Sequence, residues 1–194
     1  MRIFLSRHGQ TDWNVKGLFQ GVTDIPLNDV GIGQAQALAE SMMGSGVKRV
    51  FTSELSRANL TGQIVADKLG IPCEKIPGIQ EIGLGIWQGY TWEEIQKKWP
   101  EVAYRWTQEP LTFCMENGET YQHLIDRFVA AIHKILRENQ EDVMVVSHGG
   151  CLHTIFCVMD GVELKNMQND GVIPNARAVE LDIDKFLSVW PMEG

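Results

Sequence analysis

The sequence lacks several features that would assign it to particular classes of protein. No apolar run approaches the roughly 20 residues that a membrane-spanning helix requires, and the first residues contain neither a long apolar stretch nor a cleavage pattern. Basic residues are fewer than acidic ones, 17 against 25, which gives a formal net charge of −8. An acidic surface repels polyanions at long range. We therefore expect a cytoplasmic protein with neither a membrane nor a nucleic acid as a partner.

Cysteine is also scarce. The chain has four, Cys73, Cys114, Cys151 and Cys157, and no two of them form a CxxC pair. We expect free thiols, which fit a reducing cytosol. His153 and Cys157 are four residues apart on an expected helix near Cys151, and this spacing invites a zinc site. It matches no standard zinc finger, and small cysteines are common in protein cores, so we expect no metal.

The length favours a single domain over residues 1–194. This length suffices for one well-buried core and is short for two, and the sequence contains no internal repeat or linker. The hydrophobic content of 44% and the charged content of 22% are ordinary for a globular domain. Strand-like and helix-like segments alternate along the chain, which predicts an α/β fold with a mostly parallel sheet between two layers of helices.

Short apolar runs and helical spacing of apolar residues give the positions of the expected elements. Strands are expected at residues 2–6, 50–52, 73–76 and 143–146, with two closing strands at 178–183 and 186–189. Helices are expected after Asn28, a plausible N-cap, and over about 58–69, 92–99, 119–138 and 149–156. Residues 9–30 are expected to form a loop. The irregular segment 78–118, with four of the six tryptophans, is expected to form a lid or wall over the site.

Three of the expected strands lead into charged or titratable residues. Arg7 and His8 follow the first strand, Arg57 follows the second, and His148 follows the late strand. In open α/β sheets, ligands bind at the carboxyl ends of strands near a topological switch point, so we expect these side chains to converge. Two arginines and two histidines suit a tetrahedral dianion, because an arginine fork holds phosphate oxygens by paired hydrogen bonds.

The neighbouring residues add donors, a nucleophile and an acid. Gly9, Gly149 and Gly150 allow backbone amides to approach the same oxygens, and a helix that begins near Gly149 adds its positive end. A neutral imidazole is a nucleophile near neutral pH, and nearby arginines lower its pKa. Glu81, in a glycine-rich segment, is the best candidate acid; to hold a proton it needs a pKa raised by burial or by bound phosphate.

These residues belong to a longer ordered set of motifs that covers roughly residues 2–157. The set is Arg7-His8-Gly9-Gln10-Thr11 with Asn14, Gln20-Gly21, Pro26-Leu27 with Gly31 and Gln34-Ala35, Ser53-Glu54-Leu55-Ser56-Arg57-Ala58, Glu81 with Gly85, Trp87 and Gly89, Asn117-Gly118-Glu119-Thr120, and Ser147-His148-Gly149-Gly150. In this order the set resembles the histidine phosphatase superfamily, in its phosphoglycerate mutase-like branch.

The resemblance implies a mechanism and a set of site residues. It implies that His8 becomes a phosphohistidine and that Glu81 acts as general acid and then as base for water. It implies that the phosphoryl group is held by Arg7, Arg57 and His148. The pocket would also be lined by Asn14, Gln20, Gly21 and Gly149. Neither a metal nor a cofactor is implied, the partner is a small phosphorylated metabolite, and a homodimer is common in such families.

The resemblance favours a phosphatase over a mutase. Cofactor-dependent mutases are usually longer and carry tandem arginines that recognise the substrate carboxylate, whereas this chain has only Arg105, followed by Trp106, in that interval. Trp87 and Gly89 are typical of the phosphatase type. A mutase is kept as the alternative and a non-catalytic phospho-ligand binder as a third. Position 153 is histidine where many relatives have arginine, which leaves the substrate preference open.

Several residues also have plain structural interpretations. Arg57 would pair with Glu54 if it only stabilised a helix start, and Asn14 would only cap a turn. The tryptophans between residues 87 and 106 suit a substrate-binding wall and a packed core equally well. His123 and His133 are expected to face solvent.

Overall fold

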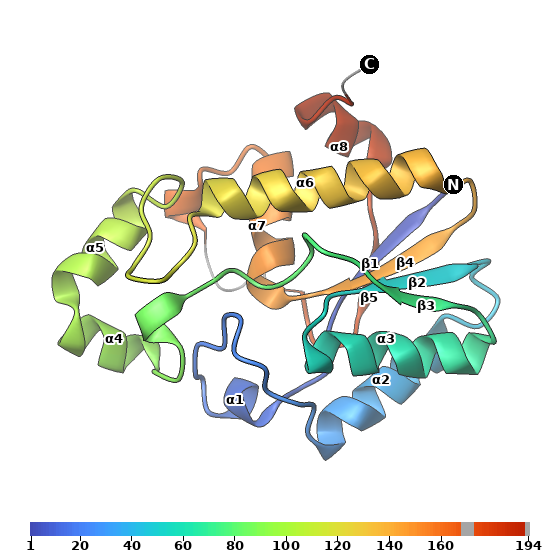
Figure 1. The fold of residues 1–194 in the computed structure, drawn as a ribbon, viewed down its shortest axis with the longest axis horizontal. Helices are drawn as coiled ribbons and strands as arrows, with labels where there is room; N and C mark the ends of the chain where they lie inside the picture. Colours follow the sequence, from blue (N-terminus) through green and yellow to red (C-terminus); the bar gives the residue numbers. More distant parts are fainter. Residues whose placement is uncertain (168–172, 193–194) are drawn as a thin grey trace.

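The computed structural model describes residues 1–167 and 173–192, and a five-stranded sheet lies at its centre (Figure 1). The strands follow the order β3-β2-β4-β1-β5. Neighbours are parallel except at one edge, where β5 runs antiparallel to β1. The strands are β1 (Ile3–Arg7), β2 (Arg49–Thr52), β3 (Cys73–Lys75), β4 (Val143–Ser147) and β5 (Ala178–Glu180). The predicted α/β class with a mostly parallel sheet is confirmed.

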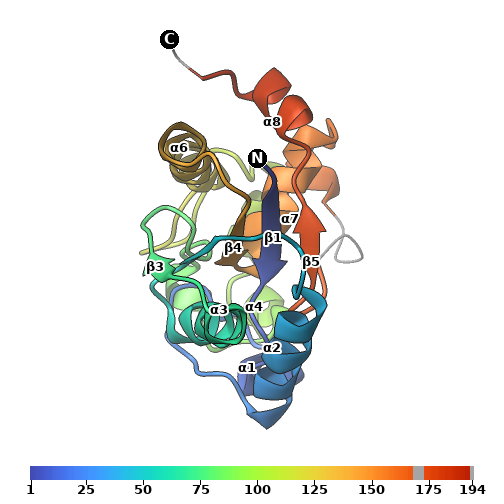
Figure 2. The same ribbon diagram turned by 90° about the vertical axis from the view of Figure 1, so that its right-hand side faces the viewer.

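Helices cover both faces of the sheet. Helices α2 and α3 lie on one face and α6 and α7 on the other, with α8 packed on α7 (Figures 1 and 2). Helices α4 and α5 extend beyond the carboxyl ends of the strands. The helices are α1 (Asp12–Val15), α2 (Asp29–Ser41), α3 (Ser56–Leu69), α4 (Trp92–Lys98), α5 (Pro100–Gln108), α6 (Tyr121–Glu138), α7 (Gly149–Met159) and α8 (Ile183–Val189), with 3₁₀ turns at Gly85–Trp87 and Leu164–Asn166. No helix in the described ranges is long and apolar enough to cross a membrane.

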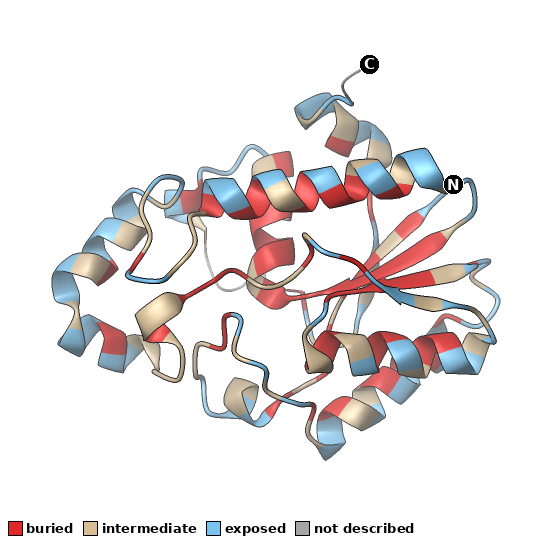
Figure 3. Ribbon diagram, in the orientation of Figure 1, coloured by how far each residue is buried: buried red, intermediate tan, exposed pale blue. Residues whose placement is uncertain are grey.

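Burial is greatest along the central strands (Figure 3). All five residues of β4 are buried, because this strand has a parallel neighbour on each side and helices on both faces. One apolar cluster, including Phe128, Ile132 and Leu152, packs α6 and α7 against the sheet, and a second, including Leu38 and Val65, packs α2 and α3. The carboxyl ends of the parallel strands are therefore fixed from both sides.

One predicted strand is wrong. Residues 186–189 belong to α8, which begins after Asp182. The Asp182 side chain accepts a hydrogen bond of 2.9 Å from the backbone N–H of Lys185, and Phe186 is fully buried. A four-residue apolar segment fits a strand or a helix equally well by its period, and here the aspartate cap favours the helix. The other closing strand is present as β5 and ends at Glu180.

Two further helices lie in segments predicted to be irregular. Helix α1 interrupts the expected loop at 9–30 and is held by a capping box in which the Thr11 and Asn14 side chains each bond the other's backbone N–H. Helix α5 has Pro100 at its first position, where its missing N–H costs no hydrogen bond. The predicted helix at 92–99 is confirmed as α4.

Candidate active site

A cavity of about 540 Å³ opens where β1 and β4 end and α3 begins. The structure places eight of the nine predicted site residues in its lining: Arg7, His8, Asn14, Gln20, Gly21, Arg57, Glu81 and Gly149. The ninth, His148, lies against His8, with ring centroids 5.2 Å apart and ring planes at 60°. Side chains from the two ends of the chain thus meet at one point because β1 and β4 are adjacent parallel strands.

His8 is held as a neutral base with one ring nitrogen available. Its Nδ1 lies 2.6 Å from the backbone oxygen of Gly9, so Nδ1 carries the hydrogen and Nε2 keeps its lone pair. Burial lowers the pKa of His8 well below its usual value, and the guanidinium groups of Arg57 and Arg7 lower it further. An unprotonated imidazole nitrogen is therefore present at neutral pH.

Arg57 is buried to 0% exposure in the first turn of α3. Its two terminal nitrogens donate hydrogen bonds of 2.8 Å to the Thr23 oxygen and 2.7 Å to the Gly21 oxygen. These bonds tie α3 to the loop after β1. The guanidinium therefore bonds this loop and not Glu54, the partner expected if Arg57 only stabilised the start of the helix. The two bonds also fix the direction of the guanidinium plane.

Buried nitrogen atoms without a protein partner cluster at this cavity. Within residues 1–167 and 173–192, no group accepts a hydrogen bond from Nε of Arg7 or Arg57, and neither ring nitrogen of His148 has a partner. His148 is fully buried; burial lowers its pKa well below the usual value, and Arg57 adds to this. Because buried polar groups are normally hydrogen-bonded, this arrangement suits a bound anion with several acceptor oxygens.

Glu81 faces the same cavity from the loop after β3. Its carboxylate accepts three backbone N–H bonds, from Ile82 at 3.0 Å, Gly150 at 3.0 Å and Cys151 at 2.8 Å. It therefore closes the N-terminus of α7. The predicted approach of the Gly9 and Gly150 amides to phosphate is wrong, because Gly150 donates to Glu81 and Gly9 donates to Thr61 Oγ1 at 3.0 Å.

The loop after β1 forms the near side of the cavity. Asn14 completes the capping box of α1 with the N-cap residue Thr11 and also lines the cavity, so the capping and pocket interpretations hold together. Gln20 is buried, and its side-chain oxygen accepts a 3.1 Å hydrogen bond from the Thr11 hydroxyl. Gly21 has φ of +52°, and a Cβ there would overlap the Gln88 side chain. The turn at Gly21 thus presents its carbonyl to Arg57.

The outer wall is aromatic and comes mainly from residues 78–118, the segment predicted to form a lid or wall, together with Tyr121 at the start of α6. Trp92, Trp106 and Tyr121 line the cavity, whereas Trp87 is fully buried beneath them. Trp92 and Trp106 therefore fit the interpretation as a substrate-binding wall, and Trp87 fits the interpretation as part of a packed core. Arg105 turns away from the cavity and pairs with Glu109 at 3.0 Å.

The remaining histidines and cysteines differ in their surroundings. His123 is exposed, as predicted, with 70% of its side chain accessible. The prediction for His133 is wrong: it is half-buried, and its Nε2 lies 3.0 Å from the Trp190 oxygen. His153 is buried and lines the cavity. All four cysteines are free, and the described residues contain no metal-binding group of three or more histidine, cysteine or carboxylate side chains.

Two residues that hold parts of the site in place are not predicted from the sequence. Thr61 receives the Gly9 N–H and donates to the Arg57 oxygen at 2.7 Å, but a threonine on an apolar helix face gives no signal of this. Arg127 donates to three backbone oxygens of the loop that carries Glu81. The usable signal was a single arginine at the edge of an amphipathic helix, eight residues after Glu119.

We expect stability to fall as the pH is lowered from 7.5 to 5.5. The folded state holds His8 and His148 neutral, whereas in the unfolded chain each takes up a proton below a pH of about 6.5. The unfolded state then binds more protons, and each histidine lowers the free energy of unfolding by up to about 1.4 kcal/mol per pH unit. Urea unfolding at several pH values measures this. Equal stability of the wild type at both pH values contradicts it, and His148→Gln is expected to flatten the dependence.

Comparison with known families gives one match over nearly the whole chain. The model of the histidine phosphatase superfamily (branch 1) matches residues 3–187. Among curated proteins, phosphoserine phosphatase 1 of Hydrogenobacter thermophilus is 29% identical over 172 residues, which is 88% of this chain and 82% of that protein. The uncharacterized phosphatase PhoE of Bacillus subtilis is 31% identical over 160 residues, or 82% of this chain and 77% of that protein.

Solved structures are similar over the same extent. Bacillus stearothermophilus YhfR superposes with a TM-score of 0.83 at 28% identity, covering 92% of this chain and 89% of that one. A mycobacterial glucosyl-3-phosphoglycerate phosphatase in complex with VO3 gives a TM-score of 0.81 at 27% identity, covering 93% and 90%.

Proposed function

The chain belongs to branch 1 of the histidine phosphatase superfamily, and from this we propose that it hydrolyses phosphomonoesters of a small metabolite through a phosphohistidine at His8. The predicted family and the predicted class, a phosphoric monoester hydrolase, are confirmed by the family match and by relatives named as phosphatases. The roles of individual residues are part of the proposal.

One observation carries it: buried nitrogens of Arg7 and Arg57 without partners in the described ranges lie in the cavity that His8 lines, and both unpartnered ring nitrogens of His148 belong to a ring in contact with His8. A phosphoryl group placed there would accept hydrogen bonds from both guanidinium groups. Phosphoryl transfer depends mainly on alignment and on neutralisation of charge at these oxygens, and fixed donors supply both without reorganisation.

In the first step, Nε2 of His8 attacks phosphorus and the bond from phosphorus to the leaving oxygen breaks. The acid form of Glu81 gives its proton to that oxygen, so the leaving group departs as a neutral alcohol. The positive charge that develops on the His8 ring is stabilised through Nδ1, whose hydrogen is donated to the Gly9 oxygen.

In the second step, water attacks phosphorus and the P–N bond breaks. The Glu81 carboxylate takes one proton from the water, and the bonding electrons return to Nε2 of His8. Inorganic phosphate leaves and both residues regain their starting forms. The same carboxyl thus serves as acid and then as base, on the two sides of one phosphoenzyme.

The cavity wall favours a leaving group that is uncharged and partly apolar. Among its described lining residues, only Arg7 and Arg57 carry a guanidinium or ammonium group, and both lie at the phosphate end. Beyond them the wall consists largely of aromatic and aliphatic side chains, including Trp92, Trp106 and Tyr121. A second anionic group on the substrate would find no further guanidinium or ammonium group among these lining residues, which also counts against the mutase alternative.

A panel of phosphomonoesters tests this assignment, with phosphate release as the readout. We expect aryl and uncharged alkyl phosphates to exceed phosphoserine and 3-phosphoglycerate by at least about tenfold in kcat/KM. Preference for a substrate with a carboxylate would overturn the proposed substrate class. Bisphosphate-primed phosphoryl transfer that exceeds hydrolysis would favour the mutase, and binding without any turnover would favour the phospho-ligand binder.

We expect Arg105→Gln to leave kcat and KM within about twofold of the wild type. The side chain pairs with Glu109 and lies over the ring of Phe113, away from the cavity. Steady-state kinetics with 3-phosphoglycerate and with p-nitrophenyl phosphate measure this. A large rise in KM for 3-phosphoglycerate alone would show that Arg105 recognises a carboxylate, as in a mutase.

We also propose a cytoplasmic location, since all four cysteines are free thiols. A homodimer, common in such families, stays a proposal that sedimentation analysis of the purified protein would decide.

A further inference from the structure

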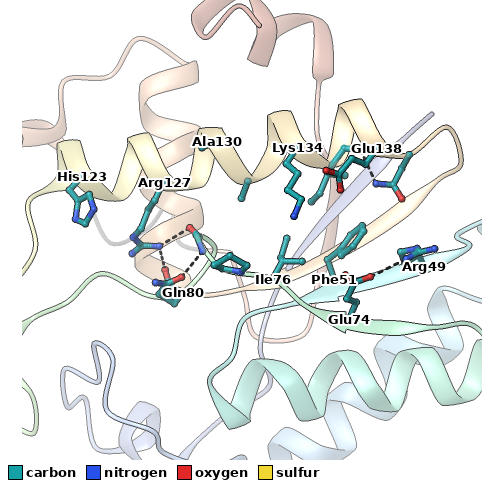
Figure 4. Close-up of a pocket in the computed structure, with 15 residues that line it drawn as sticks. Arg49, Phe51, Glu74, Ile76, Gln80, His123, Arg127, Ala130, Lys134 and Glu138 are labelled. Carbon is teal, nitrogen blue, oxygen red and sulfur yellow. Dashed lines mark hydrogen bonds and ion pairs between the residues drawn. The ribbon is translucent and has the colours of Figure 1, made fainter. Parts of the chain in front are cut away.

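The loop that carries Glu81 has a second face, turned away from the catalytic cavity. There a groove of about 540 Å³ lies between α6 and the β2–β3 edge of the sheet (Figure 4). Gly78 and Gln80 line this groove, whereas Glu81 lines the catalytic cavity. Residues 78–81 therefore form the partition between the two, and Arg127 reaches this partition from α6.

Arg127 holds the partition through its backbone. Its Nη1 donates hydrogen bonds of 2.8 Å to the Gly78 oxygen and 2.7 Å to the Gln80 oxygen. Its Nη2 donates a 3.0 Å bond to the oxygen of Glu81 itself. The carbonyl of residue 79 is bonded separately, by the Ser147 hydroxyl at 2.7 Å. Four successive carbonyls are thus fixed by two side chains.

Glu119 fixes Arg127 in turn. The Arg127 guanidinium donates two hydrogen bonds to this carboxylate, 2.7 Å from Nε and 2.8 Å from Nη2. Glu119 also accepts a 3.1 Å bond from the Gly83 N–H, and its own N–H donates to the Gly83 oxygen at 2.7 Å. Arg127 and Glu119 together therefore hydrogen-bond the backbone both before and after Glu81.

Arg127 and Glu119 both stay ionised although they are largely buried. Only 12% of the Arg127 side chain and 11% of the Glu119 side chain are exposed. Burial opposes both charges, but hydrogen bonds and the charge of Arg127 bring the pKa of Glu119 below its ordinary value, and Glu119 raises the pKa of Arg127. A bidentate pair with this burial has a defined geometry.

Gly78 allows the close approach that this geometry requires. Its φ is +92°, and a Cβ at this position would lie 2.6 Å from the backbone oxygen of Arg127. The partition can therefore rest directly on α6, with its carbonyls within reach of the guanidinium.

We propose that Arg127, oriented by Glu119, is a positioning residue that sets the place of the Glu81 carboxyl and so its efficiency as an acid. The inference rests on the proposed function. Without Arg127 the carbonyls of the partition lose three donors, and Glu81 keeps only the three amides that bond its carboxylate. General acid catalysis depends on hydrogen-bond distance to the leaving oxygen, so a small displacement weakens the first step.

This role has a signature that simple destabilisation lacks. A poor leaving group, such as the alkoxide of benzyl phosphate, needs the proton from Glu81. The p-nitrophenolate ion is a stable anion and departs without it. Loss of correct acid placement therefore lowers kcat/KM for benzyl phosphate far more than kcat/KM for p-nitrophenyl phosphate, although the leaving group of each contains a single aromatic ring.

The test compares both substrates in Arg127→Met, which keeps an apolar side chain and removes every donor. The readout is kcat/KM, because it reports the steps up to departure of the leaving group, whereas kcat also contains the hydrolysis of the phosphoenzyme, in which Glu81 serves as base for either substrate. We expect kcat/KM for benzyl phosphate to fall by about 10- to 100-fold and kcat/KM for p-nitrophenyl phosphate by less than about threefold. Arg127→Lys retains part of the donor set and is expected to recover part of the loss. Equal falls on the two substrates in folded protein would overturn the inference.

Three further variants complete the test. Arg2→Met removes another arginine–carboxylate pair, with Asp142 at 2.6 Å, and its substrate ratio is expected to stay at the wild-type value. Glu81→Gln is expected to show the same selective loss, and Arg127→Met is expected to add little to it; full additivity would contradict the inference. Glu119→Gln replaces Arg127→Met if the latter does not fold. Loss of the proposed function itself is separate, since it would appear as full activity of His8→Ala.

Discussion

His8→Ala is expected to lower kcat for p-nitrophenyl phosphate by at least about 10⁴-fold and to prevent formation of a phosphoenzyme. The variant removes the imidazole nitrogen that the proposed mechanism uses as nucleophile, in a cavity that Arg7 and Arg57 also line and next to the ring of His148. Rapid quenching with ³²P-labelled substrate measures the intermediate directly: the wild type is expected to carry an acid-labile label and the variant none.

A matched histidine variant separates this effect from damage to the fold. His133 lies on α6 against Trp190, outside the cavity, and His133→Gln is expected to keep wild-type turnover and labelling. The result that would sink the proposed mechanism is a His8→Ala protein that folds normally and retains more than about a tenth of the wild-type rate.

Arg57→Lys is expected to lower kcat/KM by about 10²- to 10³-fold although the charge is kept. The guanidinium already uses its two terminal nitrogens on the oxygens of Gly21 and Thr23, and it retains Nε for a ligand. A lysine ammonium is a point charge on a flexible stem, so it cannot bond both carbonyls in a fixed plane and also face a phosphate oxygen.

An exposed arginine provides the control for this substitution. Arg49 pairs with Glu74 on the surface, where 43% of its side chain is accessible, and Arg49→Lys is expected to leave kcat/KM within about twofold. Vanadate or phosphate inhibition of Arg57→Lys measures the loss of anion affinity separately from chemistry. Unchanged inhibition and turnover would show that Arg57 serves only to join α3 to the loop after β1.

The convergence of the site was predictable because it follows from strand order. Side chains that follow parallel strands lie at one edge of a sheet, which is enough to bring Arg7, His8, Arg57 and His148 together without knowledge of any loop. The boundaries of α8 were not predictable in this way, since residues 186–189 have no period that distinguishes a strand from a helix.

The residues that hold the site residues in place could largely not be predicted from the sequence. Arg127 acts on backbone oxygens, and carbonyls have no sequence signature. Glycine after a strand suggests close approach of the backbone to a ligand, yet the Gly150 amide donates to Glu81, a carboxylate from a loop some seventy residues earlier. Competition between a substrate and a protein side chain for the same donors is decided by tertiary packing, which spacing alone does not encode.

The hydrogen bonds at the first turn of α7 depend on whether Glu81 is protonated. The carboxyl that terminates this helix is the one proposed to alternate between acid and base, and a carboxylic acid has a weaker set of acceptor sites than a carboxylate. The hydrogen bonds from the amides of Gly150 and Cys151, two and three residues after His148, must therefore weaken and strengthen once in each turnover. The hydrogen-exchange rates of these two amides are expected to differ between the resting protein and the protein with bound vanadate.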